Sequence, residues 1–126
     1  MSAPDDRQYL ASHEWHKTEG DLVVIGISQN AVDELTDITY LEVTTESGSI
    51  DSGQTFGEIE SVKATSELYT GIAGEVVEVN QEVVDNPAII NEDCYDKGWI
   101  IKIKPGEGGA SDTLLSAQDY QAQQAD

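Results

Sequence analysis

Short runs of apolar and β-branched residues, each closed by turn-forming residues, limit most strongly how this chain can fold. The segment from His13 to Lys17 is strand-like, Thr18 to Asp21 predicts a turn, and Leu22 to Ile27 predicts a buried partner strand. Together they predict an N-terminal hairpin. Further strands are predicted at residues 38–43, 56–61 and 98–104, the last of them stopped by Pro105. Strands of this length and spacing predict a mainly β chain.

Helical signals are few and short. Ser28 is suited to cap a helix that runs through Leu35, with Ala31, Val32 and Leu35 on one face. Asn86 followed by Pro87 predicts the start of another short helix over residues 88–90. The Ser-, Thr- and Gly-rich residues 44–55 predict a loop instead.

The C-terminal part predicts one more helix outside the sheets. Residues 106–109 are glycine-rich and are expected to be flexible, and Ser111 can cap a helix over about residues 111–121. Leu114, Leu115 and Ala117 would pack this helix against the sheets. Residues 122–126 are expected to fray.

Two segments on either side of Lys63 resemble each other. Gly57 to Val62 and Gly74 to Val79 share a glycine, an acid and recurring apolar residues. Two related strands that flank one residue are what a pseudo-symmetric pair of sheets needs. The pattern therefore places Lys63 at or near a turn.

Length and cysteine content describe an ordinary intracellular chain. With 126 residues, 38% of them apolar, the sequence predicts a single domain, residues 1–126, with a core over about residues 7–105. No apolar run approaches the roughly eighteen residues of a membrane span, and the N-terminus has the pattern of neither a signal peptide nor a transit peptide. Cys94 is the single cysteine, and no Cys/His spacing predicts a zinc site. A reducing cytoplasm fits these features.

The charge is the most unusual bulk property. There are 25 acidic residues against 6 basic ones, for a net charge of −19, and the acids are spread along the whole chain. Such a surface repels nucleic acid and anionic lipid, so neither is expected as a partner. Self-repulsion also destabilises a compact fold unless salt screens it. A salt-rich prokaryotic cytoplasm fits this composition; the alternative is an acidic protein of a cell that is not halophilic.

Lys63 is one of only five lysines and stands between small residues and acids, in the sequence ESVKATSE. One interpretation is a solvated lysine loosely paired with Glu60 or Glu67, a contact that contributes about 0–1 kcal/mol. A Schiff-base role is disfavoured, because nearby acids raise a lysine pKa instead of lowering it. A covalent carrier needs a protruding amine on a tight turn with small neighbours, and this stretch meets that need.

The sequence around Lys63 resembles the lipoyl attachment site of the glycine cleavage system H proteins. The resemblance covers roughly residues 9–105 and is carried, in order and spacing, by the following segments: SHEW (12–15), GDLVVIGIS (20–28), FGEIESVKA (56–64), GEVVEVN (74–80), NP (86–87) and GWIIKIKP (98–105). The chain departs from the family at Cys94, where proline is common, and at Thr70-Gly71, where a small residue and proline are common. The resemblance implies a barrel-sandwich hybrid of two small antiparallel sheets, the fold of lipoyl and biotinyl domains.

The resemblance also implies a function, which is carriage and not catalysis. Lipoate would be joined by an amide to Lys63 by a lipoyl ligase or transferase, with Glu60, Val62 and Ala64 as hypothetical recognition residues. The arm would take the aminomethyl group of glycine from the pyridoxal-phosphate glycine decarboxylase (P protein) to the aminomethyltransferase (T protein). Dihydrolipoamide dehydrogenase (L protein) would then reoxidise it. By resemblance, Ser12, Glu14 and Glu67 map near a groove that shelters the loaded arm.

Two alternatives and several other residues bear on this interpretation. A biotinyl carrier usually has methionines beside its lysine, whereas this chain has Val62 and Ala64; an unmodified interaction module with the same fold is the other alternative.

His13 and His16 lie three apart on a strand-like segment and so are not expected to form a metal pair. We expect Trp15 and Trp99 to be core anchors and Cys94 to be an incidental thiol.

Overall fold

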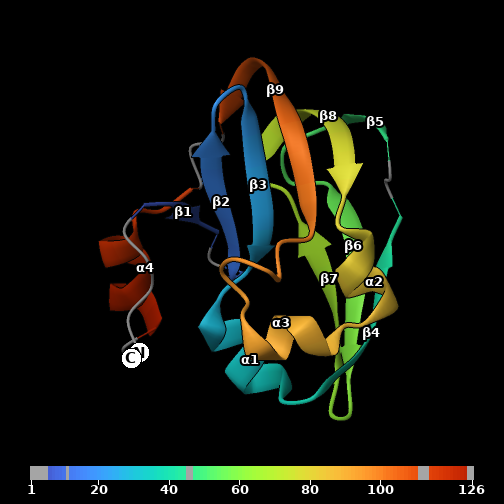
Figure 1. The fold of residues 1–126 in the computed structure, drawn as a ribbon. Coiled ribbons are helices and arrows are strands. Elements are labelled where there is room, and N and C mark those ends of the chain that lie inside the picture. Colours follow the sequence, from blue (N-terminus) through green and yellow to red (C-terminus); the bar gives the residue numbers. More distant parts are fainter. Residues whose placement is uncertain (1–5, 11, 45–46, 111–113, 125–126) are drawn as a thin grey trace.

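The computed structural model describes residues 6–10, 12–44, 47–110 and 114–124, and contains two antiparallel sheets with short helices at their edges (Figure 1). The strands are β1 (Gln8–Tyr9), β2 (Glu14–Glu19), β3 (Leu22–Ile27), β4 (Ile38–Val43), β5 (Gly48–Ile50), β6 (Thr55–Ser61), β7 (Thr65–Tyr69), β8 (Ile72–Val79) and β9 (Ile101–Ala110). The helices are α1 (Gln29–Leu35), α2 (Gln81–Asp85), α3 (Ala88–Glu92) and α4 (Ala117–Gln124). Within the described ranges no helix is long and apolar enough to span a bilayer.

The two sheets enclose one main core. The larger sheet has the strand order β1-β2-β3-β9-β8-β5, and the smaller one has the order β4-β6-β7. Apolar side chains from both sheets meet between them, for example Ile25 and Ile103 from the larger sheet with Leu41 and Ile59 from the smaller. This confirms the predicted mainly β fold of two small antiparallel sheets.

The N-terminal hairpin and the first helix form as predicted. β2 pairs with β3 from Glu14 opposite Ile27 to Glu19 opposite Leu22. The Ser28 hydroxyl accepts a hydrogen bond from the Ala31 N–H (3.4 Å), and the predicted apolar face of α1 is buried. The hairpin thus leads directly into a helix that covers one end of the core.

The two similar segments take equivalent places in the two sheets. Gly57 lies in β6 and Gly74 in β8, each next to a shift in strand register. A Cβ at Gly57 would lie 2.4 Å from the Glu42 carbonyl oxygen, and one at Gly74 would lie 2.3 Å from that of Lys104. Both positions therefore need glycine because a neighbouring strand approaches closely.

The prediction that Pro105 stops the last strand is wrong, since β9 runs on to Ala110 through the expected flexible glycines. The reason lies in the pairing of β9. β3 pairs only with residues Ile101 to Ile103, so at Pro105 the strand has β8 as its single partner, through Gly74. A proline lacks an N–H but is tolerated where one side of a strand has no neighbour.

The predicted loop at residues 44–55 contains the short strand β5, which pairs with β8 through Ile50 opposite Gly74.

The C-terminal helix begins at Ala117 and not near residue 111; Ser111 lies outside the described residues. The reason is that Leu115 first pairs with Tyr9, with backbone N–H to O distances of 2.8 and 2.6 Å, which keeps this segment extended. Ala117 and Tyr120 then pack with Tyr9 and Trp15 in a second, smaller core. The part of 122–126 that is described, up to Gln124, is still helical.

Candidate functional site

Lys63 lies in the turn that joins β6 to β7. In Figure 1 this hairpin reaches beyond the helices α1 and α3. The side chains of Val62, Lys63 and Ala64 are all exposed, with Val62 at 68%. The turn therefore presents the lysine amine to solvent with small, accessible neighbours.

Ser61 holds the turn from inside. Its hydroxyl accepts hydrogen bonds from the backbone N–H groups of Lys63 (3.1 Å) and Ala64 (3.0 Å), and its own N–H donates to the Ala64 carbonyl (2.8 Å). Outside the turn, the Val62 N–H donates to the Asp37 carbonyl (3.2 Å). A serine side chain that bonds the backbone two and three residues on is a common way to close a tight turn.

The acids near Lys63 are engaged with other residues. In the part of the chain that the structure describes, none of the ion pairs includes Lys63. Glu60 accepts from the Thr65 hydroxyl (3.4 Å), and Glu67 accepts from the Tyr69 hydroxyl (3.0 Å). The loose pairing of Lys63 with Glu60 or Glu67 is therefore not observed.

A groove of about 470 Å³ begins beside the turn. It runs from Ala64 and Thr65 along β7 to the start of β2. Its remaining lining residues come from both sheets and from α1: Ser12, His13, Glu14, Ile27, Ala31, Glu34, Leu35, Ile59, Ser66, Glu67, Leu68 and Tyr69. The three residues expected at an arm-sheltering groove, Ser12, Glu14 and Glu67, thus line one groove next to Lys63.

Glu14 is the buried acid of this groove, with 1% of its surface exposed. One carboxylate oxygen accepts from the Ser12 hydroxyl (2.5 Å) and the other from the Tyr69 N–H (2.8 Å). Burial outweighs these hydrogen bonds and raises the pKa of Glu14 from 4.5 to about 7. Near neutral pH the carboxyl group can therefore either accept a cation or hold a proton.

His13 joins the groove to the C-terminal helix. Its Nδ1 lies 2.5 Å from the Tyr120 hydroxyl, which in turn lies 2.6 Å from the Ser28 hydroxyl, while its Nε2 lies 3.1 Å from the Glu34 carboxylate. His13 has a φ of 86°, which is uncommon for a residue other than glycine. The strained backbone is thus fixed by contacts on both ring nitrogens.

The two histidines have different settings in the structure. His16 lies inside β2 and is buried, whereas His13 precedes the strand. Among the described residues, no three or more His, Cys, Asp or Glu side chains are grouped so that they could hold a metal ion.

The smaller sheet carries a row of acids beside the lysine turn. Glu42 on β4 lies opposite Glu58 on β6, which lies opposite Glu67 on β7. Like charges at opposite positions destabilise a sheet, so this row costs stability. Of the hypothetical recognition residues, Glu60 lies half-buried on β6, and Val62 and Ala64 lie in the turn.

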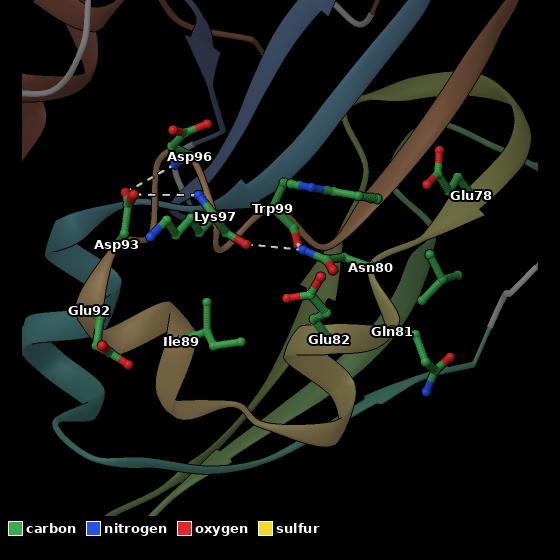
Figure 2. Close-up of a pocket in the computed structure, with 11 residues that line it drawn as sticks. Glu78, Asn80, Gln81, Glu82, Ile89, Glu92, Asp93, Asp96, Lys97 and Trp99 are labelled. Carbon is green, nitrogen blue, oxygen red and sulfur yellow. Dashed lines mark hydrogen bonds between the residues drawn. The ribbon is translucent and has the colours of Figure 1, made fainter.

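A larger hollow lies elsewhere and does not include Lys63. It measures about 1050 Å³ and is formed by α2, α3 and the segment before β9, with Glu82, Glu92 and Asp96 among its acids (Figure 2). It is open, and the Asn80 side chain at its back donates to the carbonyl groups of Lys97 (3.0 Å) and Trp99 (2.8 Å). Despite its smaller volume, the groove that begins at Ala64, the residue after the exposed lysine, is the better candidate because it contains a buried acid.

The tryptophans and the cysteine have different settings. Trp15 is a core residue as expected: it is buried, and its indole N–H donates to the Cys94 carbonyl (2.9 Å). Trp99 is only half-buried and lies before β9, with the Lys102 ammonium 4.8 Å from its ring, so it is not a simple core anchor. Cys94 is buried, which raises the pKa of its thiol to about 12 and makes it a poor nucleophile.

Sequence reasoning missed Tyr69, His13 and the apolar floor of the groove. Ile27, Leu35 and Ile59 were visible only as apolar positions of predicted strands and a helix. Which of them meet in one groove depends on how the two sheets face each other, and strand patterns do not encode that. For His13, the neighbouring Ser12 and Glu14 were the available signal.

A small β fold that presents one exposed lysine on a hairpin turn, next to a groove with a buried acid, has the architecture of a covalent carrier domain. Comparisons with known proteins define the class further. Residues 7–126 match the family model described as "Glycine cleavage H-protein". This chain belongs to the glycine cleavage H-protein family, and it is a carrier component of the glycine cleavage system.

Individual relatives agree with this assignment. The glycine cleavage system H protein of Staphylococcus carnosus is 43% identical over 120 residues, 95% of each chain. That of Bacteroides thetaiotaomicron is 39% identical over 122 residues, 97% of each chain. The crystal structure of an H protein from Mycobacterium marinum superposes with a TM-score of 0.89 at 36% identity, covering 98% of this chain and 99% of that one.

Proposed function

We propose that Lys63 carries lipoate through an amide bond and that the arm shuttles the aminomethyl group of glycine between the other proteins of the system. The observation that supports this most directly is the exposed Lys63, which forms no ion pair among the described residues and directly precedes Ala64, a lining residue of the groove that also contains Glu14. When bound, lipoate supplies a dithiolane whose sulfur accepts the one-carbon cargo. The proposed partners are the P protein, which loads the cargo, the T protein, which removes it, and the L protein, which restores the disulfide.

The groove suits such an arm in size and lining. About a dozen bonds of roughly 1.5 Å in a zigzag reach about 14 Å from the backbone, so the arm can fold back along β7 or extend into a partner. Ile27, Leu35 and Ile59 offer apolar contacts to the methylene chain. The groove and the turn therefore fit a lipoyl group on Lys63.

Glu14 suits the cargo. An amine brought next to this buried carboxylate would favour its ionised form and gain a charge-assisted hydrogen bond. Burial would also keep water away from a group that hydrolyses. In this proposal Ser12 and Tyr69 orient Glu14, Glu67 lines the outer part of the groove, and no side chain of the carrier acts as a catalyst.

The turn suits a modifying enzyme. Lipoyl ligase or transferase would recognise the accessible Val62 and Ala64 and the nearby Glu60, because these surround the amine without covering it. In this proposal, residues 1–126 form one carrier domain. From its charge of −19, we place it in a salt-rich prokaryotic cytoplasm.

Intact mass tests the attachment. Incubation with lipoyl ligase, ATP and lipoate should add one lipoyl group, and peptide mapping should find it on Lys63. Lys63→Arg should fold and take up none, because a guanidinium cannot form the amide. Lys97→Arg, at another exposed lysine, is the matched control and should be modified normally. Attachment elsewhere would refute the site, and no attachment at all would favour an unmodified interaction module.

A further inference from the structure

Two buried acceptors on one face of β2 hold the chain that leaves the lysine hairpin. Alternate residues of a strand share a face, so Glu14 and His16 point the same way. Glu14 accepts the Tyr69 N–H (2.8 Å), and the His16 Nε2 accepts the Gly71 N–H (2.8 Å). We propose that His16 is a positioning residue of the arm groove, which acts with Glu14 as a clamp on residues 69–71. The inference rests on the proposed function and extends it to a residue outside the groove.

The clamp fixes the place where the chain crosses from the smaller sheet to the larger one. Tyr69 ends β7 and lines the groove, and Ile72 begins β8. Between them the Thr70 N–H donates to the Gln54 carbonyl (3.1 Å), on the side of the residue 51–54 turn. On the opposite side, residues 69–71 have no strand partner, and the two side-chain acceptors of β2 take its place. These contacts keep Tyr69, which forms a wall of the groove, in position.

The contact requires one particular form of His16. A ring nitrogen that accepts a hydrogen bond carries no proton, so the proton of the neutral ring must lie on Nδ1. His16 has 4% of its surface exposed, and burial lowers its pKa to about 4 despite the opposing effect of the Glu14 backbone carbonyl. Nδ1 forms no hydrogen bond with any residue that the structure describes. The ring is thus retained neutral, and the bond to Gly71 is the one hydrogen bond that it makes with the described residues.

Gly71 is the other half of the pair. A proline at residue 71 would have no N–H for His16 to accept. A Cβ at Gly71 would lie 2.7 Å from Leu114 Cδ2 and 3.1 Å from Leu10 Cδ2, which are flexible side-chain ends. The clamp therefore depends on a backbone N–H at residue 71 and on histidine at residue 16 together.

The first test uses the unmodified protein and does not depend on lipoate. At pH 7 the nitrogen-15 chemical shifts of His16 should show the Nδ1–H tautomer; the Nε2–H tautomer would overturn the proposal. Hydrogen exchange of the Gly71 amide should become roughly five- to tenfold faster in His16→Leu, which removes the acceptor. In His16→Gln the amide oxygen can take the place of Nε2, so exchange should stay near the wild-type rate. Equal exchange in wild type and His16→Leu would also overturn the clamp.

The second test concerns the groove. Release of the aminomethyl cargo from the lipoylated protein should be at least about twofold faster in His16→Leu and close to wild type in His16→Gln. In a Gly71→Pro background, which removes the donor, His16 and His16→Leu should release cargo at equal rates. Unchanged release in His16→Leu would refute a positioning role. Should Lys63 accept no lipoate, the proposed function fails, while the tautomer and exchange measurements still decide the clamp.

Discussion

Replacing Glu14 by glutamine should raise the free energy of unfolding at pH 8. At pH 4.5 the gain should be much smaller. Glutamine keeps the size of the side chain and both of its contacts. Its carbonyl can accept the Tyr69 N–H and its amide can donate to the Ser12 hydroxyl, the two groups that Glu14 contacts in the wild type. The change therefore removes little except a buried titratable proton.

The magnitude follows from the raised pKa of Glu14. Its folded-state pKa is about 7 and its ordinary value is 4.5, so the folded state binds the proton more tightly than the unfolded state. The stability that this group contributes is fully present below pH 4.5 and is lost as the pH rises through 7. The difference amounts to roughly 3 kcal/mol. The stability gained by Glu14→Gln should grow by about that amount between pH 4.5 and pH 8.

The test depends on the difference between the stability-versus-pH curves of the wild type and Glu14→Gln, and not on either curve alone. Burial lowers the pKa of His16 from 6.5 to about 4, so the stability from that group is lost as the pH falls from 6.5 toward 4, which opposes the slope from Glu14. Subtracting one curve from the other cancels the contributions of His16 and of the other acids, which both proteins share. Urea unfolding at constant molar KCl, followed by tryptophan fluorescence, supplies the free energies, since Trp15 is buried in the folded state.

A difference that stays constant between pH 4.5 and pH 8 would refute this reasoning, because it would mean that Glu14 is ionised in the folded state at no cost. Glu67→Gln is the matched control in the same groove. Its carboxylate is exposed, so the stability difference should stay within roughly 0.5 kcal/mol. The same Glu14→Gln protein should be lipoylated normally and yet lose its aminomethyl cargo faster, and equal cargo lifetimes would contradict the proposed role of Glu14.

Three further outcomes are expected. Ser61→Ala should lower the free energy of unfolding by roughly 0.5–1.5 kcal/mol in urea titrations and slow lipoylation, because the turn loses its internal acceptor; an unchanged rate would show that the enzyme does not need the turn preformed. Cys94 should react with a thiol reagent at least about a hundredfold more slowly in the folded than in the unfolded protein, and fast labelling of the native state would contradict its burial. The melting temperature should rise from low to multimolar KCl as the charge of −19 is screened, and a flat or falling curve would remove the halophilic interpretation.

The strands and the lysine turn could be predicted from local patterns. Leu22 to Ile27 and Ile38 to Val43 have the composition of strands, and the glycines at 57 and 74 mark equivalent strands in both sheets. Local sequence is sufficient here because propensity, turn residues and burial agree. The resemblance added Lys63 as the proposed attachment residue and three residues that line the groove: Ser12, Glu14 and Glu67.

The rest depended on contacts between distant segments. Pro105 predicts a strand end because a proline lacks an N–H, but β9 has no partner on one side at this residue, which removes that cost. Leu115 pairs with Tyr9, more than 100 residues earlier, so the helix starts later than its cap signal indicates. His16 looked like a hairpin residue, and its role with Gly71 follows only from the crossover between the sheets.

The strand order of the larger sheet sets an order of events during synthesis. All three strands of the smaller sheet lie between residues 38 and 69, so the lysine turn can acquire its sheet partners early. β3 must wait for Ile101 to Ile103 before it has its second neighbour. Pairings over such distances form late, and domains form as the ribosome releases them. A ligase that contacts only the turn could therefore modify a nascent chain, whereas one that also contacts the groove needs β2 and α1 packed against the smaller sheet.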